Sequence, residues 1–249
     1  MYLRRTRDEA LSLLASGHSL SAVSSELGIN RSTLRSWRDH GAESRLGAPC
    51  PVCEGHALPD QAAYSALFGF YLGDGCLGRN RFTWSLRVSC DRTYPGIIRD
   101  VSALIRDVRR EASVQHVPAP GVVVVQSYWK HWPCLFPQHG PGRKHERTLV
   151  MASWQDDVVR KHPGPFLRGL LHSDGCRSAN WTARMVAGER KRYDYPRWQF
   201  VNASPEIRAW CCEALDRVGV PWRLSGPRTV SVSTRAGVAV LDEVVGPKA

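Results

Sequence analysis

The sequence predicts an α+β protein in which a small all-α unit precedes a duplicated αββαββα unit. The stretch from Ala63 to Cys76 has a second copy from Pro165 to Cys176, at an offset of one hundred residues (174 − 74). After each copy, predicted strands and helices follow in the same order, which is typical of an internal duplication. Residues 7 to 40 instead show three short helical segments separated by turns.

Each copy is predicted to be a short buried helix. Residues 62 to 73 contain no charged side chain, and the second copy keeps small residues at Gly169 and Ser173. A glycine within a helix costs about 1 kcal/mol relative to alanine. We therefore interpret the small residues as the surface where the two helix backbones meet. In the first copy they form one helical stripe, at Ala62, Ala66, Gly69 and Gly73.

Both copies end in Asp-Gly-Cys, which places Asp74 and Asp174 at helix C-termini. The helix dipole disfavours a carboxylate there by about 0.3–1 kcal/mol, and the glycines that follow, Gly75 and Gly175, suit a left-handed cap. If the helices pack side by side, the two carboxylates repel each other unless a cation lies between them. Carboxylate oxygens favour Mg²⁺. A simple Asp-Gly turn is the alternative for one copy, but the repetition in one frame argues against it.

Residues 67–75 and 167–175 resemble the nine-residue motif of the LAGLIDADG homing endonucleases, of the two-motif, monomeric type. The anchor positions that match are Leu67, Gly69, Asp74 and Gly75, and Leu167, Gly169, Asp174 and Gly175. The resemblance implies a pseudo-twofold saddle with the motif helices at its interface. It also implies that Asp74 and Asp174 bind metal and each serve cleavage of one DNA strand. We assign Gly73 and Ser173 to the same metal site.

Residues 1–41 resemble a helix-turn-helix DNA-binding domain. Helices are predicted over 9–15, 21–27 and 31–38, with Gly28-Ile29-Asn30 as the tight turn. A three-helix scaffold with a solvated basic face is the alternative. The predicted core is Leu20, Val23, Leu27, Ile29, Leu34 and Trp37. The predicted DNA contacts are Arg31, Ser32, Thr33, Arg35, Ser36 and Arg38.

A linker over 42–59 contains Cys50-Pro-Val-Cys53 and His56. Cys-x-x-Cys is half of a structural zinc site, which normally needs four ligands. His56, and His40 before the linker, are the candidates to complete it, because the sequence has no second Cys-x-x-Cys. Zinc is therefore possible at Cys50, Cys53 and His56, but two unligated thiols are the favoured interpretation.

Residues 60–249 are predicted to hold the two repeats, at about 60–161 and 162–249. A turn is expected after Asp74. Strands are predicted over 81–90, 122–128, 180–187, 197–202, 221–224 and 229–233, and helices over 95–110, 205–218 and 236–245. Strict alternation from Arg81 to Cys90 predicts an apolar face of Phe82, Trp84, Leu86, Val88 and Cys90. The opposite, exposed face is expected to carry Arg81, Thr83, Ser85, Arg87 and Ser89.

A formal net charge of +11 favours a polyanionic partner. Two basic loops, predicted at 137–147 and 188–196, add to the charge of the strands, and together they indicate a groove that follows DNA phosphates. We expect double-stranded DNA as the partner, no membrane, and a monomer. The scattered cysteines and the absence of an apolar leader or span favour a cytoplasmic, nucleoid-associated protein. The predicted saddle contacts are Arg81, Thr83, Ser85, Arg87, Arg184, Arg190, Lys191, Arg192 and Arg197.

The function predicted from these features is that of a metal-dependent DNA endonuclease, a hydrolase that uses Mg²⁺ or Mn²⁺ at Asp74 and Asp174. Gln126 and Lys130 are the candidates for auxiliary catalytic residues. The rival hypothesis is a DNA-binding transcriptional regulator that does not cleave. Some bacterial transcription factors resemble a LAGLIDADG core joined to a helix-turn-helix, commonly with an eroded acidic pair, whereas both aspartates stand here.

Overall fold

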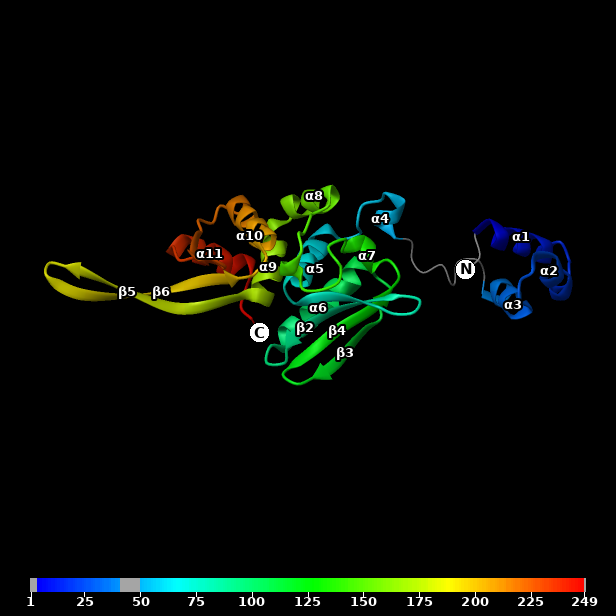
Figure 1. Cartoon of the computed structure of the whole chain (residues 1–249), viewed down its shortest axis with the longest axis horizontal. Coiled ribbons are helices and arrows are strands. Elements are labelled where there is room, and N and C mark those ends of the chain that lie inside the picture. The colour runs from blue at the N-terminus through cyan, green and yellow to red at the C-terminus, as the bar shows by residue number, and fades with distance from the viewer. Residues whose placement is uncertain (1–3, 41–49, 249) are drawn as a thin grey trace. The chain divides into compact units, whose positions relative to one another are not determined.

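The computed structural model describes residues 4–40 and 50–248, and it divides the chain into two compact units, Met1–Cys50 and Pro51–Ala249 (Figure 1). The boundary between them falls inside the predicted linker, of which residues 42–49 lie outside the described residues. No helix in the described residues is long and apolar enough to cross a membrane.

The first unit consists of three helices, α1 (Arg4–Ala15), α2 (Leu20–Leu27) and α3 (Arg31–His40). Ser19 caps α2 by accepting a hydrogen bond from the Ala22 N–H, and Gly28 ends it with a left-handed backbone, φ +64°. The buried core is Ala10, Val23, Ile29, Leu34 and Trp37, with Leu20 and Leu27 partly buried against it. The predicted core is thereby confirmed, with α1 contributing Ala10.

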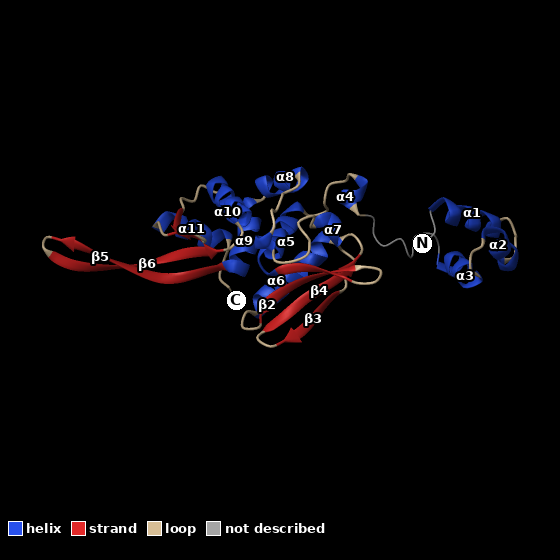
Figure 2. Cartoon of the chain, in the orientation of Figure 1, coloured by secondary structure: helices blue, strands red, loops and turns tan. Residues whose placement is uncertain are grey.

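The second unit contains two copies of one topology (Figure 2). Two four-stranded antiparallel sheets have the equivalent strand orders β1-β2-β4-β3 and β5-β6-β8-β7. The predicted αββαββα duplication is therefore correct. The first copy comprises α5 (Gln61–Asp74), β1 (Gly75–Arg79), β2 (Trp84–Asp91), α6 (Pro95–Val108), β3 (Val114–Ala119), β4 (Val122–Trp129) and α7 (Trp132–Leu135). The second comprises α9 (Pro163–Asp174), β5 (Gly175–Val186), β6 (Glu189–Val201), α10 (Pro205–Arg217), β7 (Arg223–Gly226), β8 (Thr229–Val232) and α11 (Arg235–Val244).

Three short elements stand outside the repeated order: α4 (Pro51–Glu54) precedes the first copy, and η1 (Lys144–Glu146) and α8 (Ser153–Lys161) connect the two copies. The basic segment predicted over 137–147 is thus largely a loop, as expected, with η1 as its one regular turn.

Helices α5 and α9 pack against each other through their glycines. A Cβ atom placed on Gly69 would lie 2.5 Å from the Phe166 carbonyl oxygen and 2.9 Å from the Cα of Gly169. Every side chain from Ala63 to Leu72 on α5 is buried. The predicted contact of the two helix backbones is confirmed, because only a hydrogen atom fits where the helices cross.

The glycines after the aspartates have a different role from the predicted one. Gly75 and Gly175 have φ of −95° and −102°, which is not left-handed. A Cβ on Gly75 would instead lie 2.5 Å from the Cα of Tyr71, so glycine is needed for space. Strand β1 begins directly at Gly75, and the turn predicted after Asp74 is wrong. The chain passes from helix to strand without a loop.

The alternation predicted from Arg81 to Cys90 holds only within the strand. Leu86, Val88 and Cys90 are buried, while Arg87 and Ser89 are exposed. Arg81, Phe82 and Thr83 lie before β2, where Phe82 is 82% exposed and the Arg81 guanidinium lies 4.8 Å from its ring centre. Ser85, predicted to be exposed, is buried and donates a hydrogen bond to the Gly78 carbonyl oxygen. The pattern fails where the antiparallel partner β1 ends.

The loop predicted at 188–196 is wrong. Strands β5 and β6 form one long hairpin, closed by Ala187 and Gly188 with φ of 52° and 81°. Positive φ at both positions matches the twist of a two-residue hairpin. The basic residues at 190–192 therefore lie on β6, in the ribbon that extends beyond the helices in Figure 1. Strand β3 escaped prediction because Pro118 and polar residues interrupt its pattern, which an edge strand tolerates.

Replacing either crossing glycine by alanine should destabilise the second unit. Alanine would favour the helix by about 1 kcal/mol through its higher helix propensity. Its methyl group would clash with backbone atoms that cannot turn away, and such overpacking costs about 1–3 kcal/mol or more of stability. The cost of the clash should therefore exceed the gain in propensity. We expect Gly69→Ala and Gly169→Ala to lower the melting temperature by several degrees, at about 2–4 °C per kcal/mol. Near-UV circular dichroism would measure this. Gly226→Ala is the matched control, since its Cβ would meet Thr229 at an ordinary 3.6 Å; equal effects at all three positions would contradict the packing argument.

Candidate active site

The crossing of α5 and α9 brings Asp74 and Asp174 together at one end of the helix pair. A Cβ on Gly73, the residue before Asp74, would lie 3.2 Å from the Asp174 Oδ2. Asp174 is half-buried and accepts a 2.6 Å hydrogen bond from the Asn202 amide, whereas Asp74 keeps an exposed edge. The two carboxylates thus lie at the same end of the helix pair, as predicted, and near enough for the charge of Asp174 to raise the pKa of Asp74.

The surroundings make ionisation of both aspartates costly. Loss of hydration, and then the charge of Asp174, raise the pKa of Asp74 to about 6. Burial also raises the pKa of Asp174, although the Asn202 hydrogen bond and two lysines oppose this. Because both pKa values are raised, the pair favours an added cation.

Two lysines supply positive charge in equivalent places. Lys144, in η1, donates hydrogen bonds to the carbonyl oxygens of Gly75 at 2.5 Å and Gly73 at 3.3 Å. Lys248 donates to the carbonyl oxygen of Gly175 at 2.6 Å. Burial lowers the pKa of Lys144 to about 8 and lowers that of Lys248 as well. Each lysine therefore holds the carbonyl of the glycine that follows one aspartate.

Sequence reasoning missed these lysines and chose Gln126 and Lys130 instead. Gln126 lies on the sheet surface, where its amide donates to Gln115 and to the Tyr128 hydroxyl. Lys130 is exposed beside His131 and is not among the residues that line the cavities at the aspartates. Their spacing in the sequence could have pointed to these lysines, because each follows the aspartate of its own repeat at a similar distance. Lys144 follows Asp74 by 70 residues (144 − 74), and Lys248 follows Asp174 by 74 (248 − 174).

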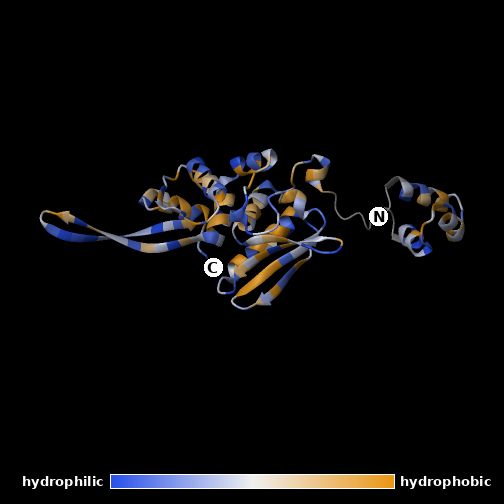
Figure 3. Ribbon diagram, viewed as in Figure 1, coloured by the Kyte–Doolittle hydropathy of each residue, from blue (hydrophilic) through white to orange (hydrophobic). Residues whose placement is uncertain are grey.

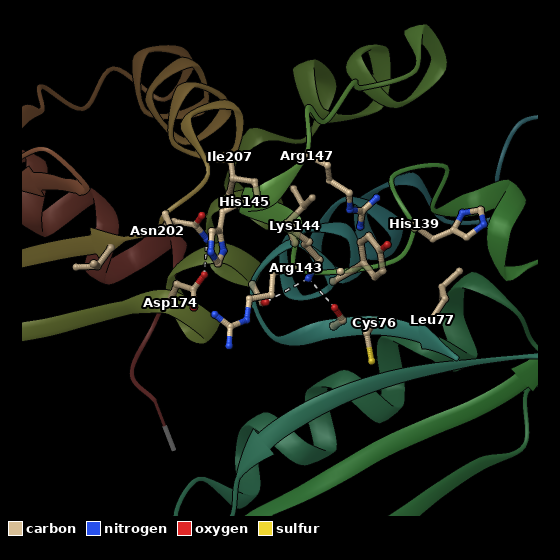
Figure 4. Close-up of a pocket in the computed structure, with 18 residues that line it drawn as sticks. Cys76, Leu77, His139, Arg143, Lys144, His145, Arg147, Asp174, Asn202 and Ile207 are labelled. Atoms are coloured by element: carbon tan, nitrogen blue, oxygen red, sulfur yellow. Dashed lines mark hydrogen bonds between the residues drawn. The ribbon is translucent and has the colours of Figure 1, made fainter. Parts of the chain in front are cut away.

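Each aspartate opens into a cavity shared with the other repeat, and Figure 4 shows the cavity at Asp174. The larger, about 420 Å³, is lined by Asp174, Asn202 and Lys144. Arg143 and Arg147, from the loop between the repeats, add positive charge to its wall, and His145 lies beside them. The smaller, about 120 Å³, is lined by Asp74, Ser173 and Lys248. A lysine and a carboxylate recur in both, as a pseudo-twofold axis requires.

Strand register reveals where the two cavities differ. Gly75 pairs with Val88 in the first sheet, and Gly175 pairs with Phe200 in the second. Cys90 lies two residues after Val88, and Asn202 lies two residues after Phe200. Cys90 in the first repeat is therefore equivalent to Asn202 in the second. Asn202 donates to Asp174, whereas the buried Cys90 thiol, whose pKa is raised by burial and then by the Asp74 charge, supports Asp74 less well. The first carboxylate consequently lacks the hydrogen bond that stabilises the second.

The donor set at the carboxylates suits a hard divalent cation. The oxygen groups at this end of the helix pair are two carboxylates and the Gly73 carbonyl oxygen, which also accepts from Lys144, and oxygen ligands of this kind are those of Mg²⁺ and Mn²⁺. Among the predicted metal residues, the Ser173 hydroxyl donates to the carbonyl oxygens of Gly169 and Leu170, which holds it on its own helix. The residues present thus fit a metal between Asp74 and Asp174.

Polar side chains cross the outer face of each sheet in register, starting beside the aspartates. In the first sheet the row is Cys76, Arg87, Gln126 and Gln115. In the second sheet the row is Cys176, Gln199, Ser231 and Arg223. The opposite face of each strand is apolar and buried, as at Leu86, Trp198 and Phe200. Except at Ser231, which is buried, the outer faces therefore offer hydrogen-bonding groups at the spacing of a sheet.

The hairpin β5–β6 divides the predicted basic residues between two faces. Ser178 pairs with Arg197, and Arg184 pairs with Lys191, at positions an even number of residues from Cys176 and Gln199, hence on the same face. Arg190 and Arg192 lie on the other face, where Arg192 forms an ion pair with Asp194. The tip is apolar and exposed at Met185 and Val186, visible as hydrophobic colour in Figure 3.

In the first unit, α3 presents the predicted DNA contacts on its outer side. Arg31, Ser32, Arg35 and Arg38 are exposed, while Thr33 and Ser36 are half-buried beside Leu34. Arg38 forms an ion pair with Asp39, and the Asn30 side chain accepts from the Ser32 N–H at the start of the helix. A row of basic and hydroxyl side chains thus runs along one helix face.

No protein-family model matches the chain, and no curated protein matches it significantly in sequence. Solved structures do match. Variants of the homing endonuclease I-DmoI superpose with a TM-score of 0.50 and 12% identity, over 75% of this chain and 97% of that one. The N-terminal LAGLIDADG domain of DUF199/WhiA gives a TM-score of 0.46 at 13% identity, over 76% and 83% of the two chains. For the LAGLIDADG meganuclease I-AabMI bound to uncleaved DNA, the values are 0.46 and 11%, over 73% and 82%. The likeness concerns the fold: the second unit has the LAGLIDADG fold that the paired motifs imply.

Proposed function

We propose that this protein is a metal-dependent endonuclease that binds duplex DNA and hydrolyses one phosphodiester in each strand. The observation that carries the proposal is the pair of equivalent cavities, each with an aspartate from one repeat and a lysine from the other. Cleaving two antiparallel strands needs two equivalent sites, which a pseudo-twofold axis provides. The similar fold of the homing endonuclease I-DmoI supports the proposal of such an activity.

Asp74 and Asp174 would hold Mg²⁺ or Mn²⁺, which supplies Lewis-acid stabilisation of phosphate oxygens and lowers the pKa of bound water. The chain's own groups perform the remaining tasks. Lys144, whose pKa is about 8, can give or take a proton near neutral pH at its Nζ. Arg143 and Arg147 line the cavity beside Asp174 and are placed to bind a phosphate through charged hydrogen bonds.

The DNA would lie along the outer sheet faces, with base edges reached from the polar rows that begin at Cys76 and Cys176. A two-stranded ribbon fits the major groove of B-DNA, so we place the β5–β6 face with Arg197, Arg184 and Lys191 there. The three-helix unit would act as a helix-turn-helix that reads a second segment through the exposed residues of α3. Both contacts are consistent with the chain's net charge of +11.

The second candidate function is a DNA-binding regulator without cleavage, and one observation favours it. Lys144 and Lys248 already set two ammonium groups against two carboxylates, and their charges oppose the rise in pKa of both aspartates. The centre is thus balanced in charge without a metal. Metal-dependent cleavage separates the two functions.

Asp74→Asn and Asp174→Asn should each abolish double-strand cleavage of a site selected from a random duplex library, while DNA binding persists. Losing a metal-binding carboxylate should cost several kcal/mol of transition-state stabilisation, at about 1.4 kcal/mol per tenfold in rate. Single-turnover cleavage in Mg²⁺ or Mn²⁺ measures this. Asp157→Asn, an exposed carboxylate on α8, is the control and should cleave like wild type. A selected site that is bound tightly yet stays intact in both metals would establish the regulator.

Metal binding should weaken as the pH falls through about 6. Asp74 is protonated below its raised pKa, and a proton competes with the metal for the carboxylate, so affinity should drop about tenfold per pH unit below that value. Calorimetric titration with Mn²⁺ or Ca²⁺ from pH 5 to 8, without DNA, measures the slope. Asp74→Asn should flatten the part of the curve near pH 6. A wild-type affinity that does not change between pH 5 and 7 would exclude this site.

The two faces of the hairpin should differ in DNA binding. Arg184→Ala with Lys191→Ala should weaken binding and reduce the slope of log K against log salt by about 0.9 for each phosphate that the protein no longer neutralises. Arg190→Ala with Arg192→Ala removes the same charge from the other face, so a smaller change is expected. Fluorescence anisotropy at several salt concentrations gives both slopes. Identical effects of the two double variants would show that the hairpin acts only by its net charge.

A further inference from the structure

We propose that Cys50, Cys53, His131 and Cys134 form a structural zinc site. These side chains each offer one ligand atom, and all four atoms lie within 4.8 Å of one another. They come from two places, the start of the second described stretch and the end of the first repeat, which lie about eighty residues apart in the chain (131 − 53 = 78). The proposal reverses the expectation of unligated thiols.

The distances between three of the ligand atoms are close to those around a tetrahedral ion. Cys53 Sγ lies 3.3 Å from Cys134 Sγ and 3.5 Å from His131 Nδ1, and Cys134 Sγ lies 3.7 Å from the same Nδ1. Zn–S bonds of about 2.3 Å and Zn–N bonds of about 2.0–2.1 Å in a tetrahedron place neighbouring ligand atoms about 3.6–3.8 Å apart. Cys₃His is a ligand set of closed structural zinc sites. None of the three cysteines forms a disulfide, and zinc binds cysteine as the thiolate.

One half of the site is fixed by the fold itself. His131 and Cys134 stand at the start of α7 and within it, and Trp132 between them is fully buried, with its indole N–H donating to the Ser127 carbonyl oxygen. The His131 ring also packs edge-on against Trp129. Helix α7 is thereby held on the sheet, and both ligands are oriented before any metal binds.

The other half needs the metal. Helix α4 has four residues, Pro51–Glu54, too few for a helix to be stable alone. Gly55, with φ +70°, turns the chain back, and the His56 N–H donates to the Pro51 carbonyl oxygen, so Cys50 and Cys53 face one side. Cys50 is buried although it lies within the predicted linker. A zinc ion shared with α7 would explain why such a short helix is ordered.

The candidate ligand from sequence, His56, is not part of the group. Its imidazole is 72% exposed and lies near Glu54, and the side chain of His40 falls outside the described residues. The histidine that completes the site is His131, in the spacing His131-x-x-Cys134. In each half, two residues separate the two ligands, so each half can chelate the ion. The nitrogen of His131 that lies near the sulfurs is Nδ1.

The test is metal analysis of the full-length protein, produced with zinc in the medium and dialysed under reducing conditions. We expect one zinc ion per chain by mass spectrometry. Replacement by Co²⁺ should give the intense visible absorption of a tetrahedral thiolate site. Wild-type protein without zinc, or a cobalt spectrum of octahedral oxygen coordination, would overturn the proposal. Neither measurement requires a variant that folds.

Variants then locate the ion. Cys134→Ser and His131→Ala should lose most of the zinc, whereas His56→Ala should keep it. Asp74→Asn combined with Asp174→Asn should also keep it, which separates this site from the carboxylate centre. Zinc retained in Cys134→Ser, or lost in the aspartate variant, would refute the assignment. Because the readout is zinc content, its result is independent of whether the protein cleaves DNA.

Discussion

The contact between the backbones of α5 and α9 is the constraint on which the rest of the second unit depends. Only glycine at positions 69 and 169 lets the helices come this close, because a methyl group at either would meet carbonyl oxygen. The same contact creates the pseudo-twofold axis and carries both aspartates to one end of it. One packing contact thus determines both the interface of the repeats and the place of the two carboxylates.

Bringing two carboxylates together has an electrostatic cost that the surroundings only partly offset. Lys144 and Lys248 reach the site from the ends of the two repeats and hold the backbone just after each motif. Burial lowers their own pKa values, so the site also disfavours the charged form of each lysine. Such opposed shifts of acids and bases in one place are typical of functional centres. A purely structural interface would gain stability by losing these charges.

The two halves are similar without being identical. Asn202 supports Asp174, while its equivalent, Cys90, gives Asp74 no comparable hydrogen bond, and the cavity beside Asp174 is the larger one, about 420 Å³ against about 120 Å³. The second repeat also carries the long hairpin, which the first lacks. A duplicated chain is free to change each half separately.

The sequence alone determined the helix pair, the αββαββα order and the two aspartates, because these rest on local signals: a stripe of small residues, period-two or period-three-to-four patterns, and a repeat of fixed offset. It also singled out Cys50 and Cys53. Only the tertiary structure decided which other side chains lie beside the aspartates and the cysteines. Lys144, Lys248, Asn202, His131 and Cys134 approach their partners from at least 28 residues away in the chain (202 − 174), through loops and strand ends whose positions no periodicity encodes. The same reason explains two errors. Pairing with strand β1 buries Ser85, and pairing with strand β5 gives residues 189–196 an extended backbone, although local composition predicted neither.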